Sequence, residues 1–469
     1  MFPNSLPIQQ DIGKFGLMRP QGIASISHPA SSILLQYSTT GCPVDTGLDW
    51  THHQIITALK RRPHISAKEP AAKEYLLKET KEKIQGGYMN IIKWGDIKHI
   101  YPKNLKISPV AMIPHKSRSY RCILDLSFQL KVNNKKIDSV NMGTKLQAPQ
   151  KAMSYLGSVI NRLIYLLADN YNKNVPFIFS KCDVKDDFWR MVINLRDAWN
   201  FAYVIPSTNR INNIDDIELA IPHALQMGWA ESPPYFCSAT ETGRDVIQTY
   251  FTTRRYIPPH PFEHHLTKHI HQHHKSTTPS TSQTMFEVYV DDFIAATNNI
   301  TVEHTKKMAR AILHGIHAIF PPPTVTGHKG EDPISIKTLQ QLEGMFATEK
   351  EILGWVFNGK DFTIALPTDK CDIISNTITS TLKHNTIQRN NLEKLQGKLV
   401  HAATGISGGR GLLPPLYRAV ASQKDVIIIN NNLKACLQDW KTLLKQIGSR
   451  PTSVLELVPR DPEFIAYVD

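Results

Sequence analysis

Two adjacent aspartates, Asp291 and Asp292, lie at a predicted β-turn between two strands whose other residues are apolar. Carboxylates in such a turn repel each other and lose hydration unless cations neutralise them. The pair therefore suggests a divalent-metal site, and Asp183, at the end of another predicted buried strand, would complete a ligand set for two hard cations. Taken alone, the pair is also compatible with a solvated Asp-Asp turn.

The elements that must position these aspartates are predicted from hydrophobic periodicity. A strand is expected over 174–182, and two strands over 285–297 surround the acidic pair. A helix of about five turns is expected to begin at Ser232, because Ser followed by Pro is a helix-start pattern. A helix over 70–84 carries the pairs Glu74/Lys78 and Glu79/Lys83, and another helix ends at Ile319. Further strands are expected over 110–114, 120–126 and 200–206, a hairpin over 353–366, and helices over 392–402 and 433–447.

Two segments show no sustained pattern. Residues 1–50 are rich in Pro, Gly, Ser and Thr, and are predicted to be a poorly ordered leader, linker or tail of a longer polyprotein. Residues 252–284 are predicted to be an exposed insertion. Six clustered histidines within it could bind zinc or copper, but they lack Cys or carboxylate partners at finger-like spacing, which favours a solvated basic loop near nucleic acid. These histidines are His264, His265, His269, His271, His273 and His274.

The overall composition indicates a globular protein with a polyanionic partner. The 469 residues include 54 Lys and Arg against 41 Asp and Glu, which gives a formal net charge of +13. The apolar fraction of 41% excludes the collagen, coiled-coil and low-complexity classes. The sequence shows no membrane span and no secretion signal, which predicts an intracellular protein of unknown compartment. Its six cysteines are widely spaced, which predicts reduced thiols.

Four motifs occur in order around the aspartates: Ser119–Ser127 (SYRCILDLS), Asp183–Trp189 (DVKDDFW), Leu225–Pro233 (LQMGWAESP) and Tyr289–Asp292 (YVDD). This series resembles the reverse transcriptases of retroviruses and of long-terminal-repeat or DIRS-like retrotransposons, from about His64 to the C-terminus. Ile352–Trp355 resembles the family's primer-gripping hairpin, and Leu395–Ala403 its thumb helix. Two positions depart from the pattern: Asp187 replaces an Ala, and Met227 stands where many members place a nucleotide-contacting Gln.

The resemblance implies an α+β fold of the right-hand polymerase type, with fingers, palm and thumb and a mostly helical C-terminal part. Fingers and palm are expected over 51–365, with the insertion at 252–284, and thumb or connection helices over 366–450. Residues 451–469 resemble the truncated start of a ribonuclease H-like domain, in which Asp469 matches a metal-binding Asp. A single such residue predicts no hydrolysis of RNA–DNA hybrid. Alternatively, these residues close a connection subdomain.

The implied activity is that of an RNA-directed DNA polymerase that extends a primer 3′-hydroxyl with dNTPs. The expected partners are an RNA template, a DNA primer and the RNA–DNA hybrid, without a membrane; the sequence does not indicate the oligomeric state. Asp183 and Asp291, assisted by Asp292, are expected to hold two Mg²⁺ ions, with Mn²⁺ as a possible substitute. The nucleotide-binding residues implied are Arg121, Lys116 or Arg118, Asp186, Phe188 and Gly228.

Each implied role has an alternative. Arg121 and Lys116 are expected to clamp the triphosphate, but could be solvated surface cations. Phe188 is expected to select deoxynucleotides by colliding with a 2′-hydroxyl, but could be a packed core residue. Gly228 is expected to let backbone approach the nucleotide, but could serve an ordinary turn. For the whole chain, the alternatives are an inactive retroelement remnant that only binds nucleic acid, and a polymerase that copies DNA.

Overall fold

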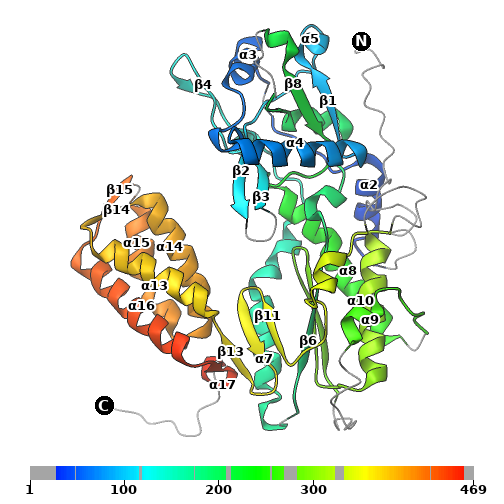
Figure 1. The fold of residues 1–469 in the computed structure, drawn as a ribbon, viewed down its shortest axis with the longest axis vertical. Helices are drawn as coiled ribbons and strands as arrows, with labels where there is room; N and C mark the ends of the chain where they lie inside the picture. Colours follow the sequence, from blue (N-terminus) through cyan, green and yellow to red (C-terminus); the bar gives the residue numbers. More distant parts are fainter. Residues whose placement is uncertain are drawn as a thin grey trace.

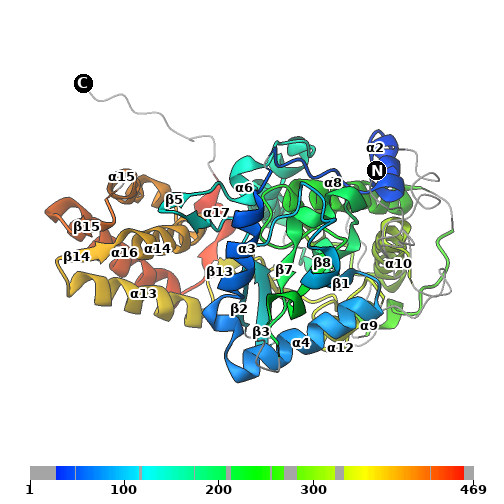
Figure 2. The ribbon, with the colours of Figure 1, turned by 90° about the horizontal axis from the view of Figure 1, so that it is seen from above.

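The computed structural model describes residues 28–47, 49–115, 119–173, 175–207, 213–253, 256–268, 282–322, 332–422 and 424–458. The fold mixes helices with several small antiparallel sheets. Figure 1 shows an upper part, a middle part below it, and a mostly helical C-terminal part, coloured orange to red, that lies to one side. Figure 2 shows the same lateral separation from above.

The described residues of the N-terminal segment, 28–47 and 49–50, are folded, which differs from the predicted poorly ordered leader over 1–50; residues 1–27 lie outside the described residues. Helix α2 (Ser31–Thr40) places Leu34 and Tyr37 in the main core, and Trp50 is buried as well. Helix α3 (His52–Arg61) then begins with a capping box at Thr51. A few apolar side chains are thus enough to hold this Ser- and Thr-rich segment against the core, although its overall composition suggested disorder.

The upper part combines a three-stranded sheet, in the order β1-β8-β7, with a separate hairpin formed by β2 and β3. Helix α4 begins with Pro70 as predicted and contacts β1 and β3. The strand expected over 200–206 is shorter, because residues 195–201 form a 3-10 segment. The elements are α4 (Pro70–Gln85), β1 (Met89–Lys93), α5 (Trp94–Ile97), β2 (Val110–His115), β3 (Ser119–Leu124), β4 (Lys131–Val132), β5 (Lys135–Lys136), α6 (Val140–Gly143), β7 (Tyr203–Val204) and β8 (Glu218–Pro222).

The middle part is built on the antiparallel sheet β6-β10-β9. Side chains along β6 alternate between two cores: Ile178 and Cys182 join the core of the N-terminal half, whereas Phe177 and Phe179 join the core of the C-terminal part. Because both faces are buried, the sheet is a fixed wall between the two cores. The elements are α7 (Val159–Ala168), β6 (Ile178–Asp183), α8 (Ser232–Thr252), β9 (Thr284–Tyr289), β10 (Asp292–Thr297) and α10 (Val302–Ile319).

The described part of the predicted insertion is not an exposed loop. Helix α9 (Glu263–Thr267) contacts α10, Leu266 is fully buried, and the Glu263 carboxylate pairs with Arg310 at 2.7 Å. His264 and His265 lie in α9, whereas His269, His271, His273 and His274 lie outside the described residues. The expectation of an exposed loop is therefore wrong for α9, because apolar and ionic contacts hold this helix to α10.

The C-terminal part combines the sheet β11-β12-β13-β16 with a helical bundle. The predicted hairpin is present, and β16 extends it by pairing with β13. Val454 is fully buried next to this pairing, so residues 452–457 belong to the same core, while 459–469, including Asp469, lie outside the described residues. The elements are α12 (Ile336–Gln340), β11 (Glu349–Ile352), β12 (Trp355–Asn358), β13 (Thr363–Ala365), α13 (Thr368–Leu382), β14 (Thr386–Gln388), α14 (Arg389–Ala402), α15 (Pro414–Ala421), β15 (Val426–Ile428), α16 (Asn431–Ser449), β16 (Thr452–Ser453) and α17 (Val454–Leu457).

Across the described ranges, none of the helices has the length and apolar character that crossing a membrane requires.

Candidate active site

The end of β6 and the turn between β9 and β10 bring three aspartates to one edge of the middle sheet. Asp183 is the last residue of β6, and it pairs directly with Asp292, the first residue of β10. Directly paired residues of an antiparallel ladder present their side chains on the same face. Asp291 lies beside them in the two-residue turn that connects Tyr289 to Asp292. The structure therefore brings together three predicted site residues that are distant in sequence.

The backbone around these aspartates is tightly held. Val290 adopts a φ of 57°, which is uncommon for a β-branched residue. The Val184 N–H donates to the Asp291 carbonyl at 3.0 Å, and the Ser335 N–H donates to the Asp183 carbonyl at 3.0 Å. These bonds tie the turn to β6 and to the segment before α12. Several backbone hydrogen bonds thus hold the carboxylates in place despite the unusual φ of Val290, as is typical of functional sites.

Burial and mutual repulsion disfavour negative charge in this cluster. Burial raises the pKa of Asp183, and the charge of Asp292 raises it further. Burial also raises the pKa of Asp291, with added repulsion from Asp187, Asp292 and Asp183. The protein therefore leaves these two groups without enough positive charge of its own.

Asp292 has a different environment, because it lies near a lysine. The Lys181 ammonium is 3.8 Å from the Asp292 carboxylate and 3.5 Å from that of Glu343. Burial lowers the pKa of Lys181, but Asp292 and Glu343 more than offset this and raise it. The pKa of Asp292 is raised by burial despite the opposing effect of Lys181. Asp292 is thus partly neutralised within the protein.

The donor set fits a hard divalent cation held by few protein ligands. Within the described residues, no three His, Cys, Asp or Glu side chains converge closely enough to form a complete metal cage. Mg²⁺ usually binds through one or two carboxylates together with substrate phosphates and water. Asp183 and Asp291 supply two such oxygen ligands on rigid elements. The residues present therefore fit Mg²⁺ bound together with a triphosphate.

The segment after β6 holds two further aspartates with different partners. Asp186 forms an ion pair with Lys83 of α4 at 3.0 Å. Burial raises the pKa of Asp186, but Lys83 and Arg190 outweigh this effect and lower it. Asp186 also has a φ of 61°, in the left-handed region, before the 3-10 turn Asp187–Arg190. The carboxylate predicted to contact substrate is thus engaged with the fingers helix α4.

Phe188, the predicted sugar-contacting residue, lies in this 3-10 turn and is 9% exposed. Its ring meets the ring of Phe236 edge-on, with centroids 5.4 Å apart. Phe236 in turn stacks on Phe320. Phe188 therefore packs into the main core and leaves a small part of its surface exposed. Its role in sugar selection stays a prediction.

Gly228 serves a close approach between two parts of the protein. It has a φ of 110°, and a Cβ there would lie only 2.2 Å from the carbonyl oxygen of Leu124 in β3. The Asn141 side-chain amide donates to the Gly228 carbonyl at 2.8 Å, and its oxygen accepts from the Ala230 N–H at 3.0 Å. Any other residue would clash with the fingers hairpin. A glycine is therefore required at position 228 because the chain passes so close to β3.

The predicted triphosphate clamp lies at the β2–β3 hairpin. Arg121 sits in β3 opposite Ile113, is partly exposed, and has no hydrogen bond or ion pair with another described residue. Lys116 and Arg118 lie outside the described residues. In Figure 1 the hairpin extends from the upper part toward the middle part. Arg121 is thus a cation available for a ligand.

Two motifs near the C-terminus contact each other. The His401 ring in α14 is within hydrogen-bond distance of the Leu353 carbonyl, at 3.0 Å, and stacks on Trp355 with centroids 5.6 Å apart. The Lys370 ammonium donates to the Gly354 carbonyl at 3.1 Å. Leu353 and Gly354 both have positive φ, so these contacts hold a tight turn. The predicted hairpin and the predicted thumb helix therefore form one unit.

Sequence reasoning missed three residues of this region. Lys83 was expected to form a surface pair with Glu79, but it is 6% exposed and pairs with Asp186. Asp187 adds to the acidic cluster, and its only signal was the departure from the motif's alanine. Asn141, which joins the fingers to the Gly228 turn, gave no signal at all. Helical spacing predicts which residues share a face but not which face is buried.

The sequence matches no protein-family model and no curated protein. Several solved structures of a foamy viral protease–reverse transcriptase are similar in fold. A form with double-stranded DNA is 15% identical, with a TM-score of 0.47 over 95% of this chain and 63% of the other. The complex with RNA/DNA hybrid is 15% identical, with a TM-score of 0.48 over 84% and 38%. Another complex with double-stranded DNA is 16% identical, with a TM-score of 0.45 over 86% and 60%. The chain thus spans less than two thirds of the length of each.

Proposed function

We propose that this protein is an RNA-directed DNA polymerase that extends a primer 3′-hydroxyl with deoxynucleoside triphosphates. One observation carries the proposal: Asp183 and Asp291 are partly buried at one edge of the middle sheet, where burial and mutual repulsion raise the pKa of both. A protein that only binds nucleic acid has no need of such a cluster. Phosphoryl transfer needs it, because the reaction depends on positioned charge.

Asp183 and Asp291 are the residues proposed to hold Mg²⁺, or Mn²⁺ in its place. The metal ions would supply neutralisation of the triphosphate and of the developing charge on the attacking and leaving oxygens. Asp292 lies beside these two residues and keeps Lys181 near the cluster. The rigid ladder between β6 and β10 fixes the spacing of the ligands, which favours in-line displacement by positioning.

Other residues are proposed to bind the nucleotide and the nucleic acid. Arg121 projects from the fingers hairpin as a cation with no protein partner among the described residues, so it can bind phosphate oxygens by charge-assisted hydrogen bonds. The remaining surface of Phe188 would contact the sugar. The net charge of +13 favours a template–primer duplex, which proteins hold chiefly through its phosphates.

Primer extension on matched templates tests the proposal. A labelled DNA primer is annealed to RNA and to DNA templates of the same sequence, and the purified chain is supplied with dNTPs and Mg²⁺. We expect extension on RNA that EDTA abolishes. Extension on DNA alone would show a DNA-templated polymerase, and binding without extension on either template would show a nucleic-acid-binding remnant.

A further inference from the structure

A cavity of about 800 Å³ lies in the upper part of the molecule, away from the acidic cluster. Helices α3 and α5, which line it, lie at the top of Figure 1, while β6 lies in the lower half. The 3-10 turn Ile214–Asp216 borders the same cavity. Its volume is within the range of small-molecule and nucleotide sites. None of the residues proposed for polymerisation lines it.

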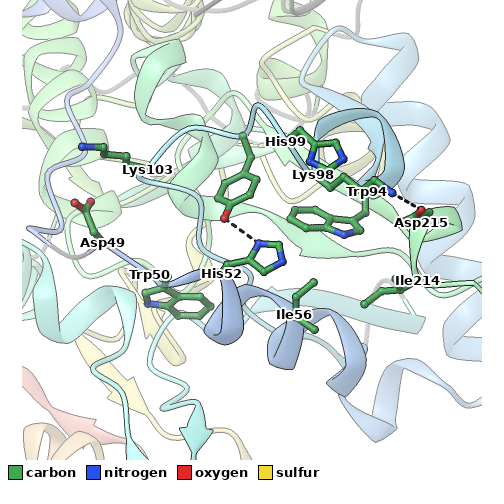
Figure 3. Close-up of a pocket in the computed structure, with 11 residues that line it drawn as sticks. Asp49, Trp50, His52, Ile56, Trp94, Lys98, His99, Lys103, Ile214 and Asp215 are labelled. Carbon is green, nitrogen blue, oxygen red and sulfur yellow. Dashed lines mark hydrogen bonds and ion pairs between the residues drawn. The ribbon is translucent and has the colours of Figure 1, made fainter.

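Aromatic rings form the wall of this cavity. The rings of Trp94 and Tyr101 lie 5.4 Å apart, and His52 stacks on Tyr101 at 6.1 Å and 26°. A hydrogen bond of 3.1 Å between the His52 ring and the Tyr101 hydroxyl fixes both side chains. Trp50 lies beside His52 in Figure 3 and is 8% exposed. The wall is therefore a rigid set of flat rings.

Charges lie at the two ends of this wall and nearly cancel. Lys98 pairs with Asp215 at 2.7 Å, so this lysine is neutralised within the protein. Figure 3 shows Lys103 and Asp49 at the opposite end of the cavity, and both residues are exposed. Such a cavity offers little net attraction for a free polyphosphate. It favours a flat, polar, weakly charged group with a phosphate within reach of Lys103.

The accessible part of this wall consists of ring faces. The His52 ring is exposed and the Tyr101 ring is partly exposed, so both can be stacked upon from the cavity. The indole N–H of Trp50 is buried and does not reach a ligand in the cavity. A nucleobase carries ring nitrogens and carbonyl oxygens that accept hydrogen bonds, and its π-face stacks on aromatic side chains.

We propose that this cavity binds one or two unpaired bases of single-stranded nucleic acid. The inference rests on the proposed function in taking nucleic acid as the partner, since a polymerase meets unpaired template ahead of the primer. A base stacks on the ring wall at His52 and Tyr101, and Lys103 contacts the flanking phosphate. Stacking is tolerant of sequence, so the site accepts any template.

Fluorescence anisotropy with a labelled 12-nucleotide single-stranded RNA, in the full chain, tests the site. Tyr101→Leu keeps an apolar side chain but removes the ring, and it is expected to weaken binding about tenfold, while Tyr101→Phe keeps the ring and the affinity. His52→Ala, at an exposed position, is a second variant with the same expectation. Tyr256→Leu removes an exposed tyrosine outside the cavity and is the matched control.

Salt titration separates stacking from charge. Tyr101→Leu should leave the slope of log affinity against log salt unchanged, whereas Lys103→Gln should reduce it by about one. Equal binding by wild type and by both ring variants would overturn the proposal, as would equal losses in Tyr101→Leu and Tyr256→Leu. Competition by AMP or GMP as effective as that by the oligonucleotide would show a free-nucleotide site instead, and also contradict it.

Primer extension by the same preparations keeps this inference separate from the proposed function. If wild type binds RNA through the cavity but extends no primer, the proposed function fails and the site stands. If wild type extends primers while the ring variants bind single strands normally, the site fails and the proposed function stands.

Discussion

The carboxylates around the end of β6 differ sharply, although Asp183 and Asp186 are three residues apart. Asp183 faces Asp291 and Asp292, and burial raises its pKa. Asp186 is partly buried as well, yet Lys83, at 3.0 Å, and Arg190 lower its pKa. Asp186 has its counter-charge within the protein, whereas Asp183 and Asp291 lie among like charges.

This difference separates a structural ion pair from a candidate catalytic site. The Lys83 ammonium also lies 4.9 Å from the Trp189 ring centroid and 5.1 Å from that of Tyr88, so the pair is enclosed by aromatic surface. Such a pair joins α4 to the segment that follows β6. Buried carboxylates that repel one another instead cost stability, and proteins keep them where chemistry requires them.

The largest expected effect is the loss of catalysis when a ligand carboxylate is neutralised. Asp183→Asn keeps the side-chain volume but removes charge, so it should lower the rate of single-nucleotide incorporation by about 1,000-fold or more, equivalent to about 4 kcal/mol. Rapid-quench kinetics measure this rate. Asp439→Asn, an exposed position on α16, is the matched control and should retain wild-type activity. Equal rates in both variants would place catalysis elsewhere.

The next effect concerns sugar selection at Phe188. If its exposed edge faces the sugar, Phe188→Val should reduce the preference for dNTPs over rNTPs by about tenfold or more, with dNTP incorporation retained. Competing dNTP and rNTP in single-nucleotide incorporation gives the ratio. An unchanged ratio with lower thermal stability would show that Phe188 acts only through its contact with Phe236.

Breaking the Lys83–Asp186 pair should affect stability. Lys83→Met leaves a partly buried carboxylate without its partner, which should lower the free energy of unfolding by about 2 kcal/mol. Adding Asp186→Asn removes the orphaned charge and should restore part of the loss. Urea unfolding followed by tryptophan fluorescence measures both changes. A single variant as stable as wild type would mean that the pair contributes little.

The smallest expected effect concerns how stability depends on pH, which should differ between the Asp183–Asp291 cluster and the Lys83–Asp186 pair. Groups with a raised folded-state pKa bind more protons folded than unfolded, so metal-free stability should fall as the pH rises above the ordinary carboxyl pKa of about 4. Asp186, with a lowered pKa, contributes stability that is lost only below about pH 4. Thermal unfolding in EDTA from pH 5 to pH 8 should show a decrease of a few degrees that is smaller in Asp291→Asn. A decrease of equal size in both proteins would argue against repulsion in the cluster.

Much of the fold could be predicted from the sequence because its elements have clear local patterns. The helix start at Ser232-Pro233, the strands around Asp291 and the hairpin around Gly359 all appear where the local pattern placed them. The N-terminal segment could not be predicted, because Leu34, Tyr37 and Trp50 acquire their role only through distant contacts. Composition describes a segment but does not show what it packs against.

The sequence was sufficient to predict the aspartates of the candidate site, but not the residues that surround them. Carboxylates at the ends of neighbouring strands are expected to lie close together, and the direct pairing of Asp183 with Asp292 is an example. Partners such as Lys83 and Lys181 depend on which helix face or strand face is buried, and local spacing does not determine this. Gly228 shows the same limit, because its close contact is with Leu124, about a hundred residues earlier.

The most direct test of the central claim is the Mg²⁺ dependence of primer extension by wild type and Asp291→Asn on an RNA template. Both proteins are first shown to bind the template–primer with similar affinity. Wild type is predicted to extend the primer at a rate that rises and saturates with Mg²⁺, while Asp291→Asn stays at background at every concentration. Extension by Asp291→Asn within about tenfold of wild type would contradict the proposed two-metal site at the end of β6.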